Sequence, residues 1–153
     1  DALNILSKER SLLERLRCET VITPHPAEMS RLTQKSVSEI QENRISIAKN
    51  FADEFGLTVV LKGARTVIAA NDGRTSINST GNHGMATAGA GDVLAGIITS
   101  LIGQGLYPYD AAVAGVYLHG LAGDIAASDK GAAGVMASDI AENISKAMIH
   151  VQS

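Results

Sequence analysis

The 153-residue sequence has few cysteines, few aromatic residues and no excess of positive charge. It contains one cysteine, so no intramolecular disulfide can form, which suits a reducing compartment such as the cytoplasm. Aromatic residues make up 3% and tryptophan is absent, which argues against stacking on nucleic-acid bases. The formal net charge is -3, so no excess of positive charge attracts nucleic acid. We therefore expect a cytoplasmic protein with no nucleic-acid partner.

Long hydrophobic runs are also lacking. No run reaches the ~18 residues that a membrane-spanning helix needs, so we expect no membrane partner. The first ten residues are charged and lack the layout of a signal peptide. Hydrophobic residues make up 45% and charged residues 19%, which is typical of a folded globular protein. The length suits one compact domain or part of a larger one.

Strand-like and helix-like segments alternate along much of the chain, which predicts an α/β fold. Short β-branched or apolar runs predict strands at 20–23, 57–61, 66–70 and 75–78. Apolar residues at helical spacing predict helices at 1–17, 36–56, 92–104, 109–128 and 138–150. Ser36 and Glu39 have the spacing of a capping box, and Ser138 could cap the last helix. The helix at 109–128 is rich in alanine and glycine, so we expect it to be buried and closely packed.

The richest chemical signal lies in residues 78–92, where four glycines precede a helix-like run. Glycine lets backbone N–H groups approach an anion, and a helix start adds about half a positive charge. Gly89 and Gly91 therefore favour a phosphate site, although the Walker ending is absent. Asp92 lies at the same helix start. It could take a proton from a hydroxyl that attacks phosphorus, or it could simply cap the helix.

A second candidate stretch follows the predicted strand at 57–61. Ligands of open α/β sheets bind beyond the carboxyl ends of strands, and Lys62 lies at such an end. Lys62 could offer its charge to a phosphate, Gly63 would let the backbone turn close to it, and Arg65 and Thr66 could add donors. The alternative, which the local sequence by itself favours, is a hairpin with a solvated lysine.

A third stretch, residues 23–28, presents His25 between two prolines at the end of the first predicted strand. His25 could bond a substrate or a neighbouring backbone group. Glu28 could hold a metal-bound water or cap the helix that follows, and we favour the cap. We expect His83 to be exposed and His119 to be a core histidine with a partner. The four histidines lack metal-ligand spacing, so the metal ligands stay unknown.

Together these stretches resemble the NAD(P)H-hydrate dehydratase family of the ribokinase-like superfamily. The matching segments keep the family's order and approximate spacing and are residues 1–6, 23–28, 62–66, 81–94 and 116–124. Ala27 stands where the family often has glycine. The resemblance implies a three-layer αβα fold. It also implies that residues 1–153 are the C-terminal part of a single dehydratase domain, with part of the sheet and without the N-terminal half.

The resemblance further implies an enzyme that restores hydrated NADH or NADPH of the S-epimer, with ADP or ATP as co-substrate and Mg²⁺. The terminal phosphate would pass to the ring hydroxyl and then leave, which restores the double bond. By matched position, His25 and Asp92 would contact the hydrated nicotinamide nucleotide, and Asp92 would be the general base. The adenine nucleotide would be held by Lys62, Gly63, Ala64, Arg65, Thr66, Gly89 and Gly91.

The sequence also leaves two other functions open. One is a small-molecule kinase of the same superfamily, of the hydroxymethylpyrimidine or hydroxyethylthiazole kinase type, and the other is a non-catalytic nucleotide-binding module. Family members often form tetramers, so we expect a homo-oligomer. A half-sheet would expose an apolar edge, so we expect the chain to need the missing N-terminal half or oligomerisation for stability. The sequence leaves open the choice between ADP and ATP and whether an epimerase domain precedes this one.

Overall fold

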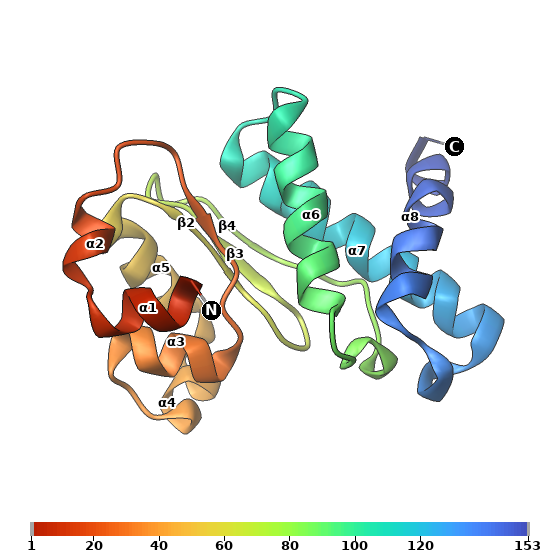
Figure 1. The fold of residues 1–153 in the computed structure, drawn as a ribbon, viewed down its shortest axis with the longest axis horizontal. Helices are drawn as coiled ribbons and strands as arrows, with labels where there is room; N and C mark the ends of the chain where they lie inside the picture. The colour runs from red at the N-terminus through yellow and green to blue at the C-terminus, as the bar shows by residue number, and fades with distance from the viewer. Residues whose placement is uncertain (1, 153) are drawn as a thin grey trace. The chain divides into compact units, whose positions relative to one another are not determined.

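The computed structural model describes residues 2–152. They form an N-terminal unit, which ends at Ile77, and a C-terminal unit, which begins at Asn78 (Figure 1). The elements of the N-terminal unit are α1 Ala2–Lys8, α2 Ser11–Glu14, β1 Val21–Ile22, α3 Pro26–Thr33, α4 Val37–Glu42, α5 Arg44–Phe55, β2 Thr58–Leu61, β3 Val67–Ala69 and β4 Thr75–Ile77. Those of the C-terminal unit are the 3-10 helix η1 His83–Met85, α6 Ala90–Gly103, α7 Pro108–Lys130, the 3-10 helix η2 Ala132–Gly134 and α8 Ala137–Gln152.

The sheet of the N-terminal unit has four strands in the order β1-β2-β3-β4. β1 pairs parallel with β2, and the other two pairs are antiparallel. Every residue of β2 and β3 is buried, which fits their sequences, since all but Thr58 are apolar. The parallel pairing places the carboxyl ends of β1 and β2 at the same edge of the sheet. The loops that follow these two strands therefore begin side by side.

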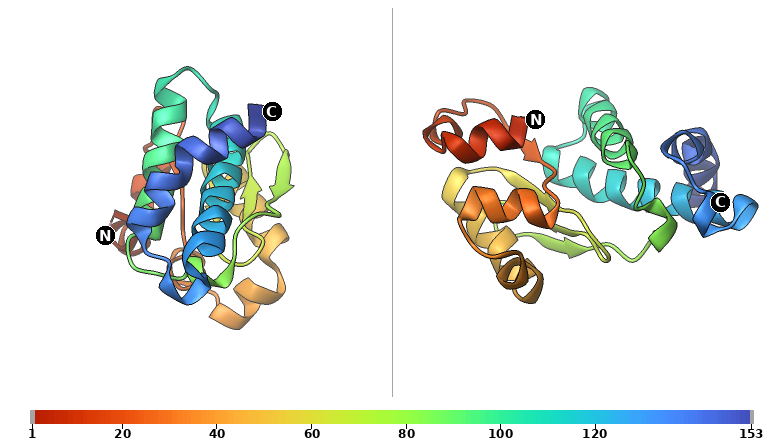
Figure 2. Two further views of the ribbon diagram at one scale, coloured as in Figure 1. Left: turned by 90° about the vertical axis from the view of Figure 1, so that its right-hand side faces the viewer. Right: turned by 60° about the horizontal axis from the view of Figure 1, so that its bottom comes forward.

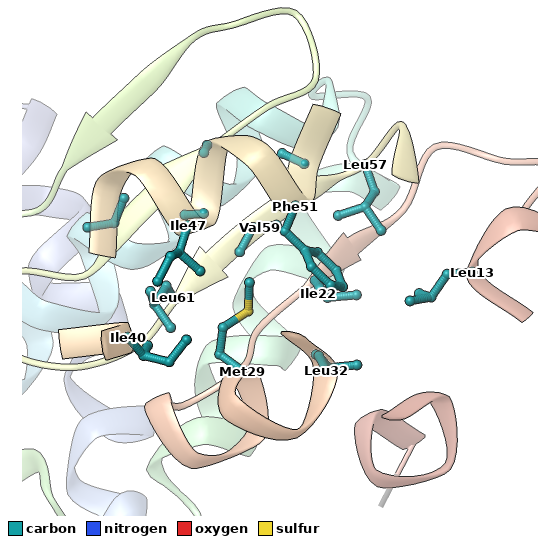
Figure 3. Close-up of a cluster of buried hydrophobic side chains, with 14 residues drawn as sticks. Leu13, Ile22, Met29, Leu32, Ile40, Ile47, Phe51, Leu57, Val59 and Leu61 are labelled. Carbon is teal, nitrogen blue, oxygen red and sulfur yellow. The ribbon is translucent and has the colours of Figure 1, made fainter. Parts of the chain in front are cut away.

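The core of the N-terminal unit lies between the sheet and its helices (Figure 3). α5 packs on β2 and β3 and buries Ile47 and Phe51 against Val59 and Leu61. From α3, Met29 enters the same cluster. The predicted helical face of residues 36–56 is thus the face that covers the sheet. Its capping box is confirmed, and the helix ends at Gly56, whose φ of 65° is the left-handed conformation that glycine favours.

Two predicted helices are broken in the structure. The helix at 1–17 is broken between Lys8 and Ser11, where Arg10 bonds Glu54 at 2.8 Å and lies over the Phe55 ring. These contacts involve residues far away in the chain, so helical spacing could not show them.

The predicted helix at 36–56 is broken at Asn43, which has the non-helical angles φ -126° and ψ 33°. Asparagine side chains compete with helical hydrogen bonding, and that of Asn43 donates to the Glu39 carbonyl. The last helix already begins at Ala137, so the capping role predicted for Ser138 is wrong. Instead, the buried Asp139 carboxylate accepts from the Met136 amide at 2.9 Å.

In the C-terminal unit α7 packs against both α6 and α8, as Figure 2 shows from two further sides. α7 is buried and closely packed as predicted, and its glycines are the reason. A Cβ on Gly115 would lie 2.7 Å from Ile98 Cγ1, and one on Gly120 would lie 2.8 Å from the Thr80 carbonyl carbon. α7 therefore admits a neighbouring helix and a loop at van der Waals distance. Among the residues described, no helix has the length and apolar content to cross a membrane.

We predict that Gly120→Ala lowers the free energy of unfolding by about 1–3 kcal/mol, because the added methyl group overlaps the backbone of Thr80. Gly96 is the matched control, since it is also helical but has nothing within 4 Å of an added Cβ. Gly96→Ala should be neutral or should stabilise by up to about 1 kcal/mol. Urea unfolding measures both changes, and equal effects of the two substitutions would contradict the close contact.

Candidate functional site

Residues 23–28 and 62–66 lie next to each other at the carboxyl edge of β1 and β2. The Lys62 amide donates to the Pro24 carbonyl at 2.8 Å, which extends the parallel pairing by one step beyond the strands. Two of the three stretches singled out from the sequence are thus brought together within the N-terminal unit. This edge is where ligands of open α/β sheets bind.

His25 is the N-cap of α3 and forms a reciprocal capping box with Glu28. The Glu28 amide donates to His25 Nδ1 at 3.2 Å, and the His25 amide donates to Glu28 Oε2 at 2.7 Å. The predicted capping role of Glu28 is confirmed. Because Nδ1 accepts a hydrogen bond, the neutral ring carries its proton on Nε2. The His25 side chain is 47% exposed, so that N–H can still reach a ligand.

Glu28 also faces Lys62. Its Oε2 lies 3.8 Å from Lys62 Nζ and 3.5 Å from His25 Nε2. The side chains of Glu28 and Lys62 are only 16% and 26% exposed. Residues 62–66 do connect an antiparallel hairpin, β2 to β3, as the alternative interpretation held. The lysine, however, is not freely solvated, because the chain holds it beside a carboxylate.

Two positive φ angles and an internal hydrogen bond define the backbone of the loop at 62–66. Gly63 has φ 143° and Arg65 has φ 57°, a left-handed conformation that is uncommon for a non-glycine residue. The Thr66 hydroxyl donates to the Gly63 carbonyl at 3.1 Å and so closes the loop. Gly63, Ala64 and Arg65 are exposed. Their backbone and side-chain groups are therefore accessible, while the Thr66 hydroxyl proton is already used within the loop.

In the C-terminal unit, the glycine-rich loop is held by Asp124 of α7. The two carboxylate oxygens of Asp124 accept from the Gly81 amide at 2.8 Å and from Asn82 Nδ2 at 2.9 Å. Asn82 Oδ1 in turn accepts from the Gly84 amide at 3.0 Å. His83 is exposed, as predicted. Asp124 was not a candidate from the sequence, because it lies more than 40 residues from the loop and no local pattern links the two.

Asp92 is not the N-cap of α6, contrary to the capping interpretation. Gly89 is the N-cap, with φ 86°, and Asp92 is the third helical residue. The Asp92 side chain is exposed, and within residues 2–152 its carboxylate has no hydrogen-bond partner. The same portion of the chain offers no acceptor to the Gly89 and Gly91 amides. The helix start therefore has free donors and a free carboxylate close together.

His119 supports this helix start from behind. Its Nε2 lies 2.9 Å from the Ala90 carbonyl, which joins α7 to the first turn of α6. The predicted partner is confirmed, although the residue is half-buried rather than in the core. Over the described part of the chain, no group of three or more His, Cys, Asp or Glu side chains could hold a metal ion.

The fold places this chain in the ribokinase-like superfamily of α/β proteins, as predicted. A solved structure of the ADP/ATP-dependent NAD(P)H-hydrate dehydratase from Bacillus subtilis, co-crystallised with ATP and Mg²⁺, matches it with a TM-score of 0.83 and 33% identity. That match covers 86% of this chain and 48% of the other.

The chain belongs to the NAD(P)H-hydrate dehydratase family, whose model matches residues 1–146. It is 53% identical to the bifunctional NAD(P)H-hydrate repair enzyme Nnr of Moorella thermoacetica, over 92% of this chain and 26% of that protein. It is 46% identical to the ADP-dependent (S)-NAD(P)H-hydrate dehydratase of Neisseria meningitidis serogroup B, over 92% and 49%. The chain thus spans half or less of the length of these relatives.

We predict that Glu28→Ala lowers the free energy of unfolding by about 1 kcal/mol, because the His25 amide loses its acceptor. Glu28→Gln should retain most of the stability, since the amide oxygen can still accept. The matched control is Glu39→Ala in the capping box of α4, which should cost a similar amount. Urea unfolding of the three variants tests this, and a Gln variant as unstable as the Ala variant would contradict the capping role.

Proposed function

We propose that the protein containing this chain restores hydrated NADH or NADPH of the S-epimer, with ADP or ATP as the phosphoryl donor. Family membership and the similarity to relatives named as dehydratases support this function over a small-molecule kinase of the same fold. The observation that carries it is the start of α6, where the exposed Asp92 carboxylate has no partner in the described chain and lies beside the free amides of Gly89 and Gly91.

In the proposed reaction the ring hydroxyl of the hydrated nicotinamide attacks the terminal phosphorus, and Asp92 accepts the hydroxyl proton. The P–O bond to the nucleotide breaks, so ADP yields AMP and ATP yields ADP. Phosphorylation turns a poor leaving group into a good one. Phosphate then leaves with its bonding electrons, and loss of a proton from the neighbouring ring carbon restores the double bond. A general base positioned in this way contributes about 10²–10⁴-fold to the rate.

The remaining residues receive binding roles. We assign the amides of Gly89 and Gly91 to the transferred phosphoryl group, because helix-start amides stabilise negative charge. The Nε2–H of His25 is assigned to the hydrated nicotinamide nucleotide, together with Asp92.

Lys62 is assigned to the outer phosphates of the adenine nucleotide, and Gly63, Ala64, Arg65 and Thr66 are assigned to its remaining contacts. Mg²⁺ is taken to arrive with the nucleotide and to neutralise phosphate charge when bound. Its protein ligands are left unassigned, in keeping with the absence of a metal-binding cluster in residues 2–152.

The proposal extends to the whole protein. We infer that residues 1–153 form the C-terminal part of one ribokinase-like domain, which is supported by their coverage of about half of the solved dehydratase. The N-terminal half of that domain is a required partner in this view, and a homo-oligomer, with a tetramer as the leading candidate, is the expected assembly. A cytoplasmic location is consistent with a single cysteine and with a substrate drawn from the reduced nicotinamide pool.

We predict that Asp92→Asn lowers turnover by at least about 10²-fold while nucleotide binding remains, because the amide cannot accept the hydroxyl proton. Asp129→Asn is the matched control, since Asp129 is an exposed acid of α7 that forms a surface ion pair with Lys146. The measurement is NADH recovered from its hydrate in the complete protein with each nucleotide in turn, alongside calorimetric nucleotide binding.

Several outcomes would contradict the proposed reaction. Comparable turnover in Asp92→Asn would remove Asp92 as the base. Accumulation of a phosphate ester without recovery of NADH would indicate a kinase. Nucleotide binding without any turnover in the complete protein would indicate a non-catalytic module.

We predict that Lys62→Ala weakens the binding of ADP and ATP about tenfold and that of AMP less, because its charge serves the outer phosphates. Lys35→Ala is the matched control, because Lys35 is an exposed lysine of the same unit that pairs with Glu39. Calorimetry with the three nucleotides measures the effect. Equal weakening of all three would place the target of Lys62 elsewhere on the nucleotide.

A further inference from the structure

Arg44, the first residue of α5, reaches the end of β2 from the helix side. Its Nη2 donates to the Leu61 carbonyl at 2.9 Å, and its Nη1 donates to Gln41 Oε1 at 3.0 Å. Leu61 directly precedes Lys62. The guanidinium therefore binds the last carbonyl of the strand from which the loop at 62–66 departs. A planar guanidinium that bridges two acceptors fixes orientation in a way that a single ammonium group cannot.

Arg44 also carries a positive charge that has no carboxylate partner among residues 2–152. Its side chain is partly buried, and burial lowers the pKa of the guanidinium from its usual value. No described carboxylate lies within ion-pair distance of it. Burying a charge costs free energy unless an opposite charge compensates for it. Arg44 therefore has a desolvation cost that no ion pair in the described chain offsets.

The Arg44 guanidinium occupies the space that a side chain at position 63 would need. A Cβ on Gly63 would lie 2.6 Å from Arg44 Nη1 and 3.2 Å from Nη2. Any side chain at position 63 would therefore push the guanidinium off the Leu61 carbonyl.

We propose that Arg44 is a positioning residue of the nucleotide site. This proposal rests on the nucleotide-binding role proposed for residues 62–66. By holding the Leu61 carbonyl, Arg44 sets the direction in which Lys62 and Gly63 leave the strand. Its unpaired positive charge also makes the loop a better place for an anion. The class of ligand that profits is a nucleoside di- or triphosphate, whose outer phosphates carry the most charge.

The test compares Arg44→Ala, Arg44→Lys and Lys49→Ala in the complete protein. Lys49 is the matched control, because it is an exposed cation of the same helix, α5. Loss of a charged hydrogen bond corresponds to about a tenfold change in affinity or more. We expect Arg44→Ala to raise the Kd and the KM for ADP about tenfold, with kcat at saturating ADP within about twofold of wild type. Arg44→Lys should restore only part of the affinity.

A merely structural role would lower the melting temperature and leave the Kd and KM of the folded enzyme unchanged, which would overturn the proposal. An equal loss of affinity in Lys49→Ala would overturn it too, because the effect would then be one of net charge. If the wild-type protein bound no nucleotide at all, the proposed function would fail first. If the wild type bound nucleotide and Arg44→Ala bound it equally well, this inference alone would fail.

Discussion

The parallel pairing of β1 with β2 is the interaction on which the candidate site of the N-terminal unit depends. The hydrogen bond from the Lys62 amide to the Pro24 carbonyl carries that pairing past the ends of both strands. It brings a histidine-bearing loop and a lysine-bearing loop, which are almost 40 residues apart in the chain, to one edge of the sheet. The Glu28 carboxylate then lies within 4 Å of both His25 Nε2 and Lys62 Nζ. Without this pairing the two loops would share no surface.

A related principle operates in the C-terminal unit, where a loop without regular structure must satisfy its backbone. Asp124 binds the Gly81 amide, and the absence of a side chain at Gly120 lets the loop lie directly on α7. His119 binds the first turn of α6 from the same helix. α7 thus holds both the loop and the helix start. Asp124 and His119 make the hydrogen bonds that hold the loop and the helix start. The amides of Gly89 and Gly91 and the Asp92 carboxylate are therefore not used for this purpose.

In both units, exposed residues and partly buried residues have different roles. Exposed groups such as His25 and Asp92 have capacity left for a ligand, whereas partly buried groups such as Arg44 and Asp124 bind backbone atoms of the loops. Preorganised donors are effective in phosphoryl transfer because they need no rearrangement when charge develops. This gives the supporting residues a physical reason to matter in the proposed phosphoryl-transfer reaction.

The sequence alone determined what depends on neighbours in the chain: the strands, the capping box at Ser36, the end of a helix at Gly56, and the glycine-rich run before α6. The family resemblance, confirmed by the comparisons, also came from short ordered motifs. Only the tertiary structure revealed the helix breaks at Arg10 and Asn43, the third-residue position of Asp92, and the supporting contacts of the loops. Periodicity and capping are local, whereas a guanidinium meets a strand carbonyl 17 residues away only after the chain has folded back on itself.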